Sequence, residues 1–195
     1  MLSEAETAGL VAALRQGRVV ACATETFFGL LADAHNPAAV ARVCELKGRD
    51  PGMPIAVLLP DLSALPSVCD VDVAAGIDER VQQLASRYWP GPLTLLLRAR
   101  SGLPVALVKD GKIGVRVPGP SPALQLTRAF GAALTATSAN LSGQPAARTA
   151  AEVSAMFPTG LAAIAGVEAP GGLASTIVDV TGPNLVLVRA GYIAL

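Results

Sequence analysis

The stretch GAALTATSANLSG, residues 131–143, contains the pattern that decides the fold. Its first half is small, apolar and rich in threonine, which is typical of a buried β-strand. The strand, expected over 133–137, runs directly into hydroxyl groups, a carboxamide and a turn at Ser142-Gly143. Ligand-binding groups of α/β proteins gather in such loops at strand ends. The stretch therefore predicts an α/β protein with a polar site behind this strand.

Helices are predicted on both sides of this strand along the chain. Asn36-Pro37 combines an N-cap residue with a proline at the first helical position, which predicts a helix over 37–47. Ser121-Pro122 begins another helix, which ends at Gly131. Four further helical segments are expected, the first two from capping boxes: Ser3–Glu6, Thr149–Glu152, 61–68 and 77–88.

Apolar strands alternate with these helices, and the segment TETFFGLLADAHN, 24–36, interrupts the pattern after the first strand. Several strands are apolar throughout, which favours a sheet covered by helices on both faces. The close spacing of the last strands indicates that part of the sheet is antiparallel. One α/β domain over residues 1–195 is expected. The remaining strands are predicted at 18–23, 54–60, 93–99, 112–118, 161–165, 175–180 and 185–190.

Composition excludes several classes of protein. Hydrophobic residues make up 52% of the 195 residues and charged residues 15%, which fits a packed globular core. The 15 basic and 15 acidic residues cancel, so only a local basic patch would favour nucleic acid. No run of about 18 apolar residues predicts a membrane span. Cys22, Cys44 and Cys69 match neither a disulfide nor a zinc pattern, so reduced thiols in a cytoplasmic protein are expected.

Polar side chains follow the first strand and the first interior helix. Thr24 and Thr26 flank Glu25, and the hydroxyls with the carboxylate can hold a small polar ligand. The alternative is an ordinary strand end, where threonine is common. Lys47 and Arg49 end the helix over 37–47, where they suit phosphate oxygens. Cations also favour any helix C-terminus, so both interpretations stand.

Two later strands carry further candidates, one with a charged residue and one with a pair of polar residues. Arg116 lies in an otherwise apolar strand, which is costly unless it is paired or faces a pocket. Ser138 and Asn140 project to one side if the chain stays extended, and both can donate and accept hydrogen bonds. An Asx-type turn is the alternative there. Ser175 and Arg189 occupy further strand ends.

The order of these segments resembles the YrdC/TsaC family of threonylcarbamoyl-AMP synthases. The similarity extends from about residue 7 to 193, and the combination of K-x-R with S-x-N is its most specific part. No Walker sequence or G-x-G-x-x-G is present, so a nucleotide would have to bind through a different set of residues. The segments that carry the resemblance are TETFFGLLADA, KGRDPGMP, WPGPLTLLL, VRVP, TSANLSGQP, STIVDV and VRAGYI.

This resemblance implies a twisted, open, mixed sheet flanked by helices, with a concave, positively charged cavity. The implied reaction joins L-threonine, bicarbonate and ATP, with Mg²⁺, into threonylcarbamoyl-AMP and releases pyrophosphate. A partner transferase complex would pass the threonylcarbamoyl group to the adenosine beside the anticodon of tRNA. The chain resembles the short form of the family, with a single domain. Contact of tRNA or other RNA with the concave face is a further implication, and no membrane partner is implied.

Residue roles follow from matched positions. Lys47, Arg49, Ser138 and Asn140 are implied to bind the nucleotide and to act in catalysis, and Arg189 to close the nucleotide side. The implied substrate contacts are Thr24, Thr26, Arg116 and Ser175. The site is expected to contain no protein-held metal.

The chain departs from the family pattern at several positions. Phe27-Phe28 stands where Val-Tyr is usual, and Met53 stands where Lys or Asn is common. Leu58 and Ala146 replace His and Ser of some relatives, and Asp50 stands at a frequent proline position. These differences leave two alternatives open. One is a related carbamoyl-adenylate enzyme with another substrate, and the other is a non-catalytic RNA-binding module.

Overall fold

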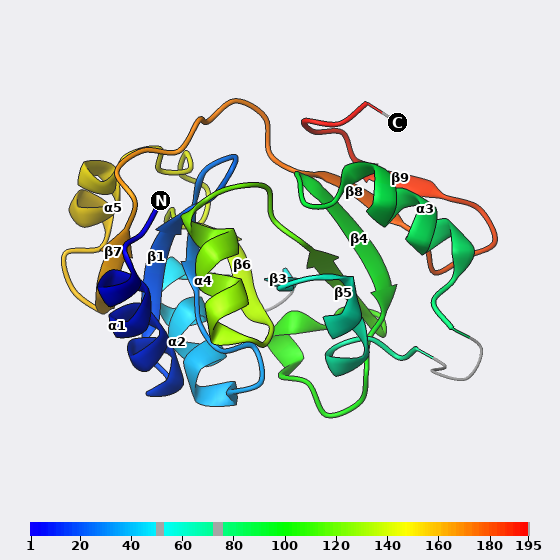
Figure 1. Ribbon diagram of the computed structural model, residues 1–195, viewed down its shortest axis with the longest axis horizontal. Coiled ribbons are helices and arrows are strands. Elements are labelled where there is room, and N and C mark those ends of the chain that lie inside the picture. The colour runs from blue at the N-terminus through cyan, green and yellow to red at the C-terminus, as the bar shows by residue number, and fades with distance from the viewer. Residues whose placement is uncertain (50–52, 72–75, 195) are drawn as a thin grey trace.

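The computed structural model describes residues 1–49, 53–71 and 76–194 (Figure 1). Its strands form a mixed, twisted sheet in the order β7-β1-β2-β6-β3-β5-β4-β8-β9. Helices flank the sheet, as the sequence predicted. The strands are β1 (Val19–Ala23), β2 (Phe28–Leu31), β3 (Ala56–Leu58), β4 (Leu93–Arg98), β5 (Lys112–Arg116), β6 (Leu134–Ser138), β7 (Leu161–Ala165), β8 (Thr176–Asp179) and β9 (Val186–Arg189). The helices are α1 (Glu4–Arg15), α2 (Pro37–Lys47), α3 (Glu79–Tyr88), α4 (Pro122–Phe130) and α5 (Ala150–Met156), with short 3-10 helices η1 (Leu62–Ser67) and η2 (Val105–Leu107).

Strand β6, which carries the stretch quoted above, joins the two parts of the sheet. It pairs antiparallel with β2 on one side and with β3 on the other. The pairs β1–β7, β3–β5 and β4–β8 are parallel, and the other neighbours are antiparallel. The sheet is therefore mixed, and its last strands include the expected antiparallel pair, β8–β9.

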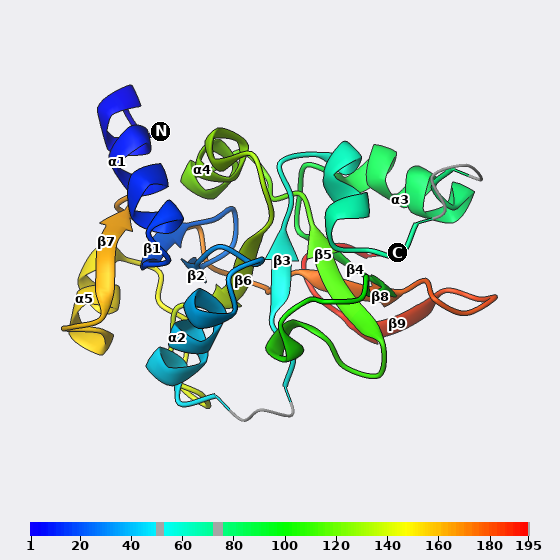
Figure 2. The same ribbon diagram turned by 90° about the horizontal axis from the view of Figure 1, so that it is seen from below.

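Helices cover both faces of the part that contains β1, β2 and β6. Figure 2 shows α1 and α4 together on one side of it and α2 and α5 on the other. Val20 of β1 packs in a cluster with Leu14 of α1, whereas Val19 belongs to the cluster that contains Val40 of α2. Because successive side chains of a strand point to opposite faces, a strand covered on both sides must be apolar throughout.

The predicted helix starts are confirmed at their capping residues. The Asn36 side chain accepts hydrogen bonds from the backbone amides of Ala38 and Ala39. Both capping boxes form, at Ser3 and at Thr149. Gly131 ends α4 with φ of 77°, a conformation that glycine adopts at little cost.

The sequence analysis was wrong about part of 24–36. Phe28–Leu31 is strand β2, fully buried between β1 and β6. The interruption is only a tight turn, in which the Thr24 amide donates to the Phe27 carbonyl at 3.1 Å. The segment 61–68 forms a 3-10 helix rather than an α-helix. Pro51-Gly52, a pair typical of a turn, and the departure at Asp50 lie outside the described residues.

The described residues contain no helix long and apolar enough to cross a membrane. Cys22, Cys44 and Cys69 are all free, and burial raises the pKa of the Cys22 and Cys69 thiols to about 12. These two thiols therefore stay protonated at neutral pH.

The cap of α2 provides a test of the fold near the site. We expect Asn36→Ala to lower the free energy of unfolding by about 1 kcal/mol, because two amides at the start of α2 lose their acceptor. Urea titration measures this difference. Asn36→Asp keeps an acceptor oxygen and should retain most of the stability. Equal loss in both variants would contradict the capping explanation.

Candidate functional site

All the residues predicted for the site line one cavity of about 360 Å³. They come from the loop after β1, the end of α2, the ends of β5 and β6, and the strands β8 and β9 with their flanks. The fold thus brings together side chains that are far apart in the sequence. The predicted residues are Thr24, Thr26, Lys47, Arg49, Arg116, Ser138, Asn140, Ser175 and Arg189.

The ammonium group of Lys47 is held by the TSANLSG segment. Its Nζ donates to the Ser138 carbonyl at 2.5 Å, to the Asn140 carbonyl at 2.9 Å and to Asn140 Oδ1 at 2.8 Å. Ser138 Oγ donates to the same Oδ1 at 2.5 Å. These three acceptors use the full donor capacity of a lysine. In this structure Lys47 therefore orders the segment and contributes its charge to the cavity from behind Ser138 and Asn140.

The turn behind these residues is also as predicted. The Gln144 amide donates to the Leu141 carbonyl at 3.0 Å, and Gly143 has φ of 83°. The Asn140 carboxamide donates to the carbonyls of Leu141 and Gln144. The Ser142 amide donates to the Lys47 carbonyl and not to Asn140 Oδ1, so this turn is not of the Asx type. TSANLSG therefore contains a turn together with side chains that line the cavity.

Burial and, to a smaller extent, the nearby Arg49 guanidinium together lower the pKa of Lys47 to about 8. Arg49 itself donates to the carbonyls of Met53 and Pro54 and to Thr137 Oγ1. Burial also lowers the pKa of Arg49, although an arginine remains charged in proteins. Two cations thus stand together at one end of the cavity, at a cost that a bound anion would offset.

The other end of the cavity combines a cation with hydroxyl groups. Arg189 donates from Nη2 to Ser175 Oγ at 3.0 Å and to the Ser175 carbonyl at 2.8 Å. Ser175 Oγ lies 2.9 Å from Thr94 Oγ1. Thr94, which was not among the predicted site residues, also lies in the cavity wall. A polar residue within the apolar run LTLLL was the signal for it.

Arg116 ends β5 and is almost completely buried. Its Nη1 lies 3.5 Å from Glu25 Oε1. Within the described residues the Arg116 guanidinium makes no hydrogen bond to the protein, so its N–H groups remain available to a ligand in the cavity. Burial lowers the pKa of Arg116, and Glu25 partly offsets this effect. The prediction that Arg116 is either paired or at a pocket is confirmed on both counts.

Thr24 and Thr26 hold the turn between β1 and β2. Their hydroxyl oxygens lie 3.1 Å apart, and Thr24 Oγ1 donates to the Phe27 carbonyl at 2.7 Å. Both residues line the cavity, whereas the Glu25 carboxylate between them points elsewhere, toward Arg116. Successive side chains of the TET sequence therefore point in different directions: the two threonines toward the cavity and Glu25 toward Arg116, whose counter-ion it is.

Most of the departures from the family pattern lie at the cavity. Phe28, Met53 and Leu58 all line it, and the phenyl ring of Phe28 is fully buried. Ala146 is not among the lining residues. Met53 remains 59% exposed, so its thioether chain can contact a ligand through apolar atoms alone.

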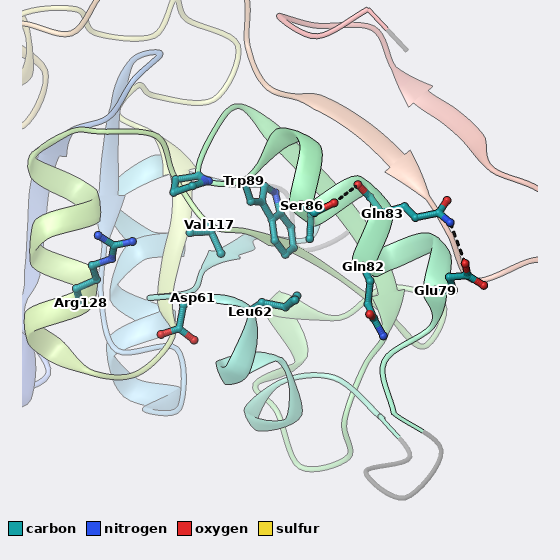
Figure 3. A pocket seen from close by; sticks show the side chains of 11 residues that line it. Asp61, Leu62, Glu79, Gln82, Gln83, Ser86, Trp89, Val117 and Arg128 are labelled. Atoms are coloured by element: carbon teal, nitrogen blue, oxygen red, sulfur yellow. Dashed lines mark hydrogen bonds between the residues drawn. The ribbon is translucent and has the colours of Figure 1, made fainter.

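A second cavity of about 600 Å³ lies between α3, α4 and the start of η1 (Figure 3). It is larger than the first, but it contains none of the predicted site residues. Trp89 and Val117 provide apolar wall, and the Arg128 guanidinium faces the cavity from α4. The choice of candidate site therefore rests on the convergence of cations and hydroxyls in the smaller cavity and not on size.

The lining residues of the predicted site include no carboxylate among the parts of the chain that the structure describes. The same parts contain no cluster of three or more His, Cys, Asp or Glu side chains that could hold a metal ion. His35 lies away from the cavity, where its amide donates to Asp33 Oδ1 and its Nε2 is 3.2 Å from the Ser67 carbonyl. The site is therefore arranged for a small, polar, anionic ligand.

A twisted mixed sheet with a cation-lined cavity at its strand ends defines an α/β protein with a candidate site for an anionic ligand. Comparison with known proteins makes this class specific. The model of the Sua5/YciO/YrdC family, described as "Telomere recombination", matches residues 12–191. The chain belongs to this family.

Named relatives extend the comparison. The threonylcarbamoyl-AMP synthase of Pyrococcus abyssi is 35% identical over 184 residues, which cover 93% of this chain and 53% of that protein. The enzyme of the same name from Bacillus subtilis is 34% identical over 98% of this chain and 55% of its own length. The chain thus spans about half the length of these curated relatives. The threonylcarbamoyl-AMP synthase of Idiomarina loihiensis is 42% identical over a region that covers 71% of this chain and 74% of that protein.

Solved structures share the fold. A crystal structure of P. abyssi Sua5 complexed with L-threonine has a TM-score of 0.90 and 33% identity, covering 98% of this chain and 55% of that one. Escherichia coli YciO has a TM-score of 0.84 over 98% of this chain and 91% of its own, at 24% identity. The fold prediction is confirmed by both structures.

The contacts of Lys47 lead to a stability prediction. Lys47→Met keeps most of the apolar part of the side chain. It leaves the carbonyls of Ser138 and Asn140 and the Asn140 Oδ1 without the donor that they have in the parent protein. We expect the free energy of unfolding to fall by about 2–4 kcal/mol, as measured by urea titration. Lys109→Met, on an exposed lysine away from this cavity, is the matched control. Equal stability of the two variants would contradict the ordering role of Lys47.

Proposed function

We propose that this chain catalyses the ATP-dependent formation of threonylcarbamoyl-AMP from L-threonine and bicarbonate, with release of pyrophosphate. The observation that carries the proposal is the convergence of Lys47, Arg49, Ser138 and Asn140 with Arg116 in one cavity. Relatives at 34–35% identity bear the name of this enzyme, and one was solved with L-threonine. Residues 1–195 are proposed to form one YrdC-like domain.

The two ends of the cavity suit the two substrates. We assign the phosphates of ATP to the Lys47–Arg49 end, where the charges are partly desolvated and therefore act strongly on an anion. Ser138 Oγ and the Asn140 carboxamide would complete the nucleotide contacts. The positive charge of Lys47 would act through the segment that it orders, in addition to any phosphate contact made after rearrangement.

L-threonine is assigned to the Arg116 end. Arg116 has unused donors for a carboxylate, and a planar guanidinium binds a carboxylate through two parallel hydrogen bonds. Thr24, Thr26 and Ser175 offer hydroxyl groups for the polar parts of the amino acid. Arg189 lies close enough to Arg116 that each charge disfavours the other, and its pKa is lowered by burial and by Arg116. A bound anion between them would relieve this repulsion.

The chemistry requires positioning and charge stabilisation. A carbamate formed from threonine and bicarbonate would attack the α-phosphorus of ATP, and pyrophosphate would leave. Negative charge develops on the phosphate oxygens, and the cationic end of the cavity stabilises it. Holding both substrates in one cavity supplies proximity. Once the carbamate exists it is itself the nucleophile, so this displacement step requires no separate side-chain base.

Mg²⁺ belongs to the proposal as a companion of ATP. Magnesium commonly binds through substrate phosphates and a few carboxylates. The described lining residues offer no carboxylate, so the phosphates and water would hold the ion. It would supply further neutralisation of phosphate charge.

The product and the location complete the proposal. A transferase complex would accept the threonylcarbamoyl group for tRNA modification, and direct contact of tRNA with the concave face is a finer part of it. The three free cysteines support a cytoplasmic setting, because thiols remain reduced there.

We expect purified protein with Mg²⁺ to release pyrophosphate from ATP only when L-threonine and bicarbonate are both present. A coupled pyrophosphate assay measures the release, and Lys47→Met should reduce it at least about tenfold. No release above a protein-free blank would refute the proposal.

Calorimetry with L-threonine, L-serine and carbamoyl phosphate identifies the substrate class. Tight binding of carbamoyl phosphate without L-threonine would favour the carbamoyl-adenylate alternative.

The lowered pKa of Lys47 predicts a pH dependence of nucleotide binding. Below pH of about 8 the side chain is charged, and above it the free protein increasingly holds a neutral amine. Because a phosphate favours the charged form, we expect ATP affinity to fall as the pH rises from about 8 to 9.5. Calorimetry across this range measures it. Lys47→Arg stays charged throughout and should show a flatter profile. The same decline in both proteins would assign it to another group.

A further inference from the structure

The least satisfied polar group of the described residues is the carboxylate of Glu25. Neither of its oxygens has a hydrogen-bond partner there, and both are closed to solvent. The side chain is 13% exposed. A buried carboxylate without donors is costly, so its presence needs an explanation. A charged neighbour of this carboxylate is Arg116, with Nη1 at 3.5 Å from Oε1.

Arg116 has the complementary problem. Its side chain is 9% exposed, and no protein acceptor in the described parts of the chain receives its N–H groups. It also lies near the Arg189 guanidinium, whose pKa it lowers. Burial disfavours the charge of Arg116, and Glu25 is the group that opposes this effect.

The local backbone makes room for this pairing. A Cβ at Gly119 would lie 2.9 Å from Glu25 Cγ and 3.1 Å from its Cβ. Gly119 lacks a positive φ, so its backbone would accept an alanine. The absent side chain at this position therefore serves the packing of Glu25. Gly119 follows β5 closely, so the same strand end provides Arg116 and the space for its counter-ion.

We propose that Glu25 is a positioning residue for substrate recognition. Its carboxylate holds the Arg116 guanidinium in place from behind the cavity wall, so that the N–H groups of Arg116 face the carboxylate of an amino-acid substrate. Glu25 does not touch the substrate, because its own oxygens are sealed. The long separation of the pair leaves the strong, bidentate hydrogen bonds of Arg116 for the ligand. This inference rests on the proposed function, since it assigns Arg116 to the amino acid.

The first test separates the two substrates. We expect Glu25→Gln, which keeps the shape and removes the charge, to raise the Kd and KM for L-threonine about tenfold. The Kd for ATP should change less than about twofold, because the Lys47–Arg49 end does not contact Glu25. Calorimetry and initial rates measure these values. Glu168→Gln, an exposed carboxylate in a loop, is the control and should bind both substrates as the parent does.

Two further variants test the cause. Glu25→Asp restores the charge on a shorter side chain and should recover part of the L-threonine affinity. Gly119→Ala should weaken L-threonine binding in the same direction, because the new methyl group displaces Glu25. Gly9→Ala is its control, since a Cβ there meets nothing within 4 Å.

Each outcome has one meaning. Unchanged L-threonine binding by Glu25→Gln, while the parent binds, overturns the inference alone. Equal losses of ATP and L-threonine binding together with a lowered Tm also overturn it and assign Glu25 to folding. An aspartate variant no better than the glutamine variant excludes charge as the cause. If the parent itself binds no L-threonine, the proposed function is wrong, and the inference fails with it.

Discussion

The contact between the Lys47 ammonium and the TSANLSG segment is the interaction on which the site depends. It ties the last residue of α2 to the loop after β6 through Ser138 and Asn140, and the Ser142 amide returns a hydrogen bond to the Lys47 carbonyl. The contact fixes one end of the cavity from both directions. A buried lysine is expensive, and the lowered pKa of Lys47 reflects that expense. Three acceptors keep the charge in place, so the site has the electrostatic character that an anionic substrate requires.

Charge in the cavity is balanced unevenly. Lys47 and Arg49 at one end are surrounded by neutral acceptors, whereas Arg116 at the other end has a carboxylate behind it. Neutral acceptors leave the full positive charge for a phosphate. A buried carboxylate reduces the net charge that an amino acid experiences, which suits a ligand that carries an ammonium group as well as a carboxylate. The more positive end therefore suits a phosphate, and the end with the carboxylate suits an amino acid that carries both charges.

The sequence predicted elements well where local chemistry decides them. Asn36-Pro37 and Ser121-Pro122 set helix starts through capping, which depends on neighbouring residues only. Strand β2 escaped prediction because FGLL is short and gains its stability from β1 and β6, which lie on either side of it in space. The grouping of Ser138 with Lys47 was expected from the resemblance of the motifs. The run LTLLL marks Thr94 as a polar residue among apolar ones, but the direction of its side chain depends on tertiary packing. The pairing of Glu25 with Arg116 depends on tertiary packing as well.

The position of β6 at the centre of the sheet has a consequence for the order of assembly. Strands β2 and β3 are early in the chain, yet neither gains its β6 neighbour until residues 134–138 have been made. The partner of β1 on its outer side, β7, comes later still, at Leu161–Ala165. Pairings between distant segments form slowly because a long loop must close first. During synthesis β1 and β2 have each other as neighbours early, but their outer neighbours β7 and β6 are made only later. The cavity is completed only when β8 and β9 arrive.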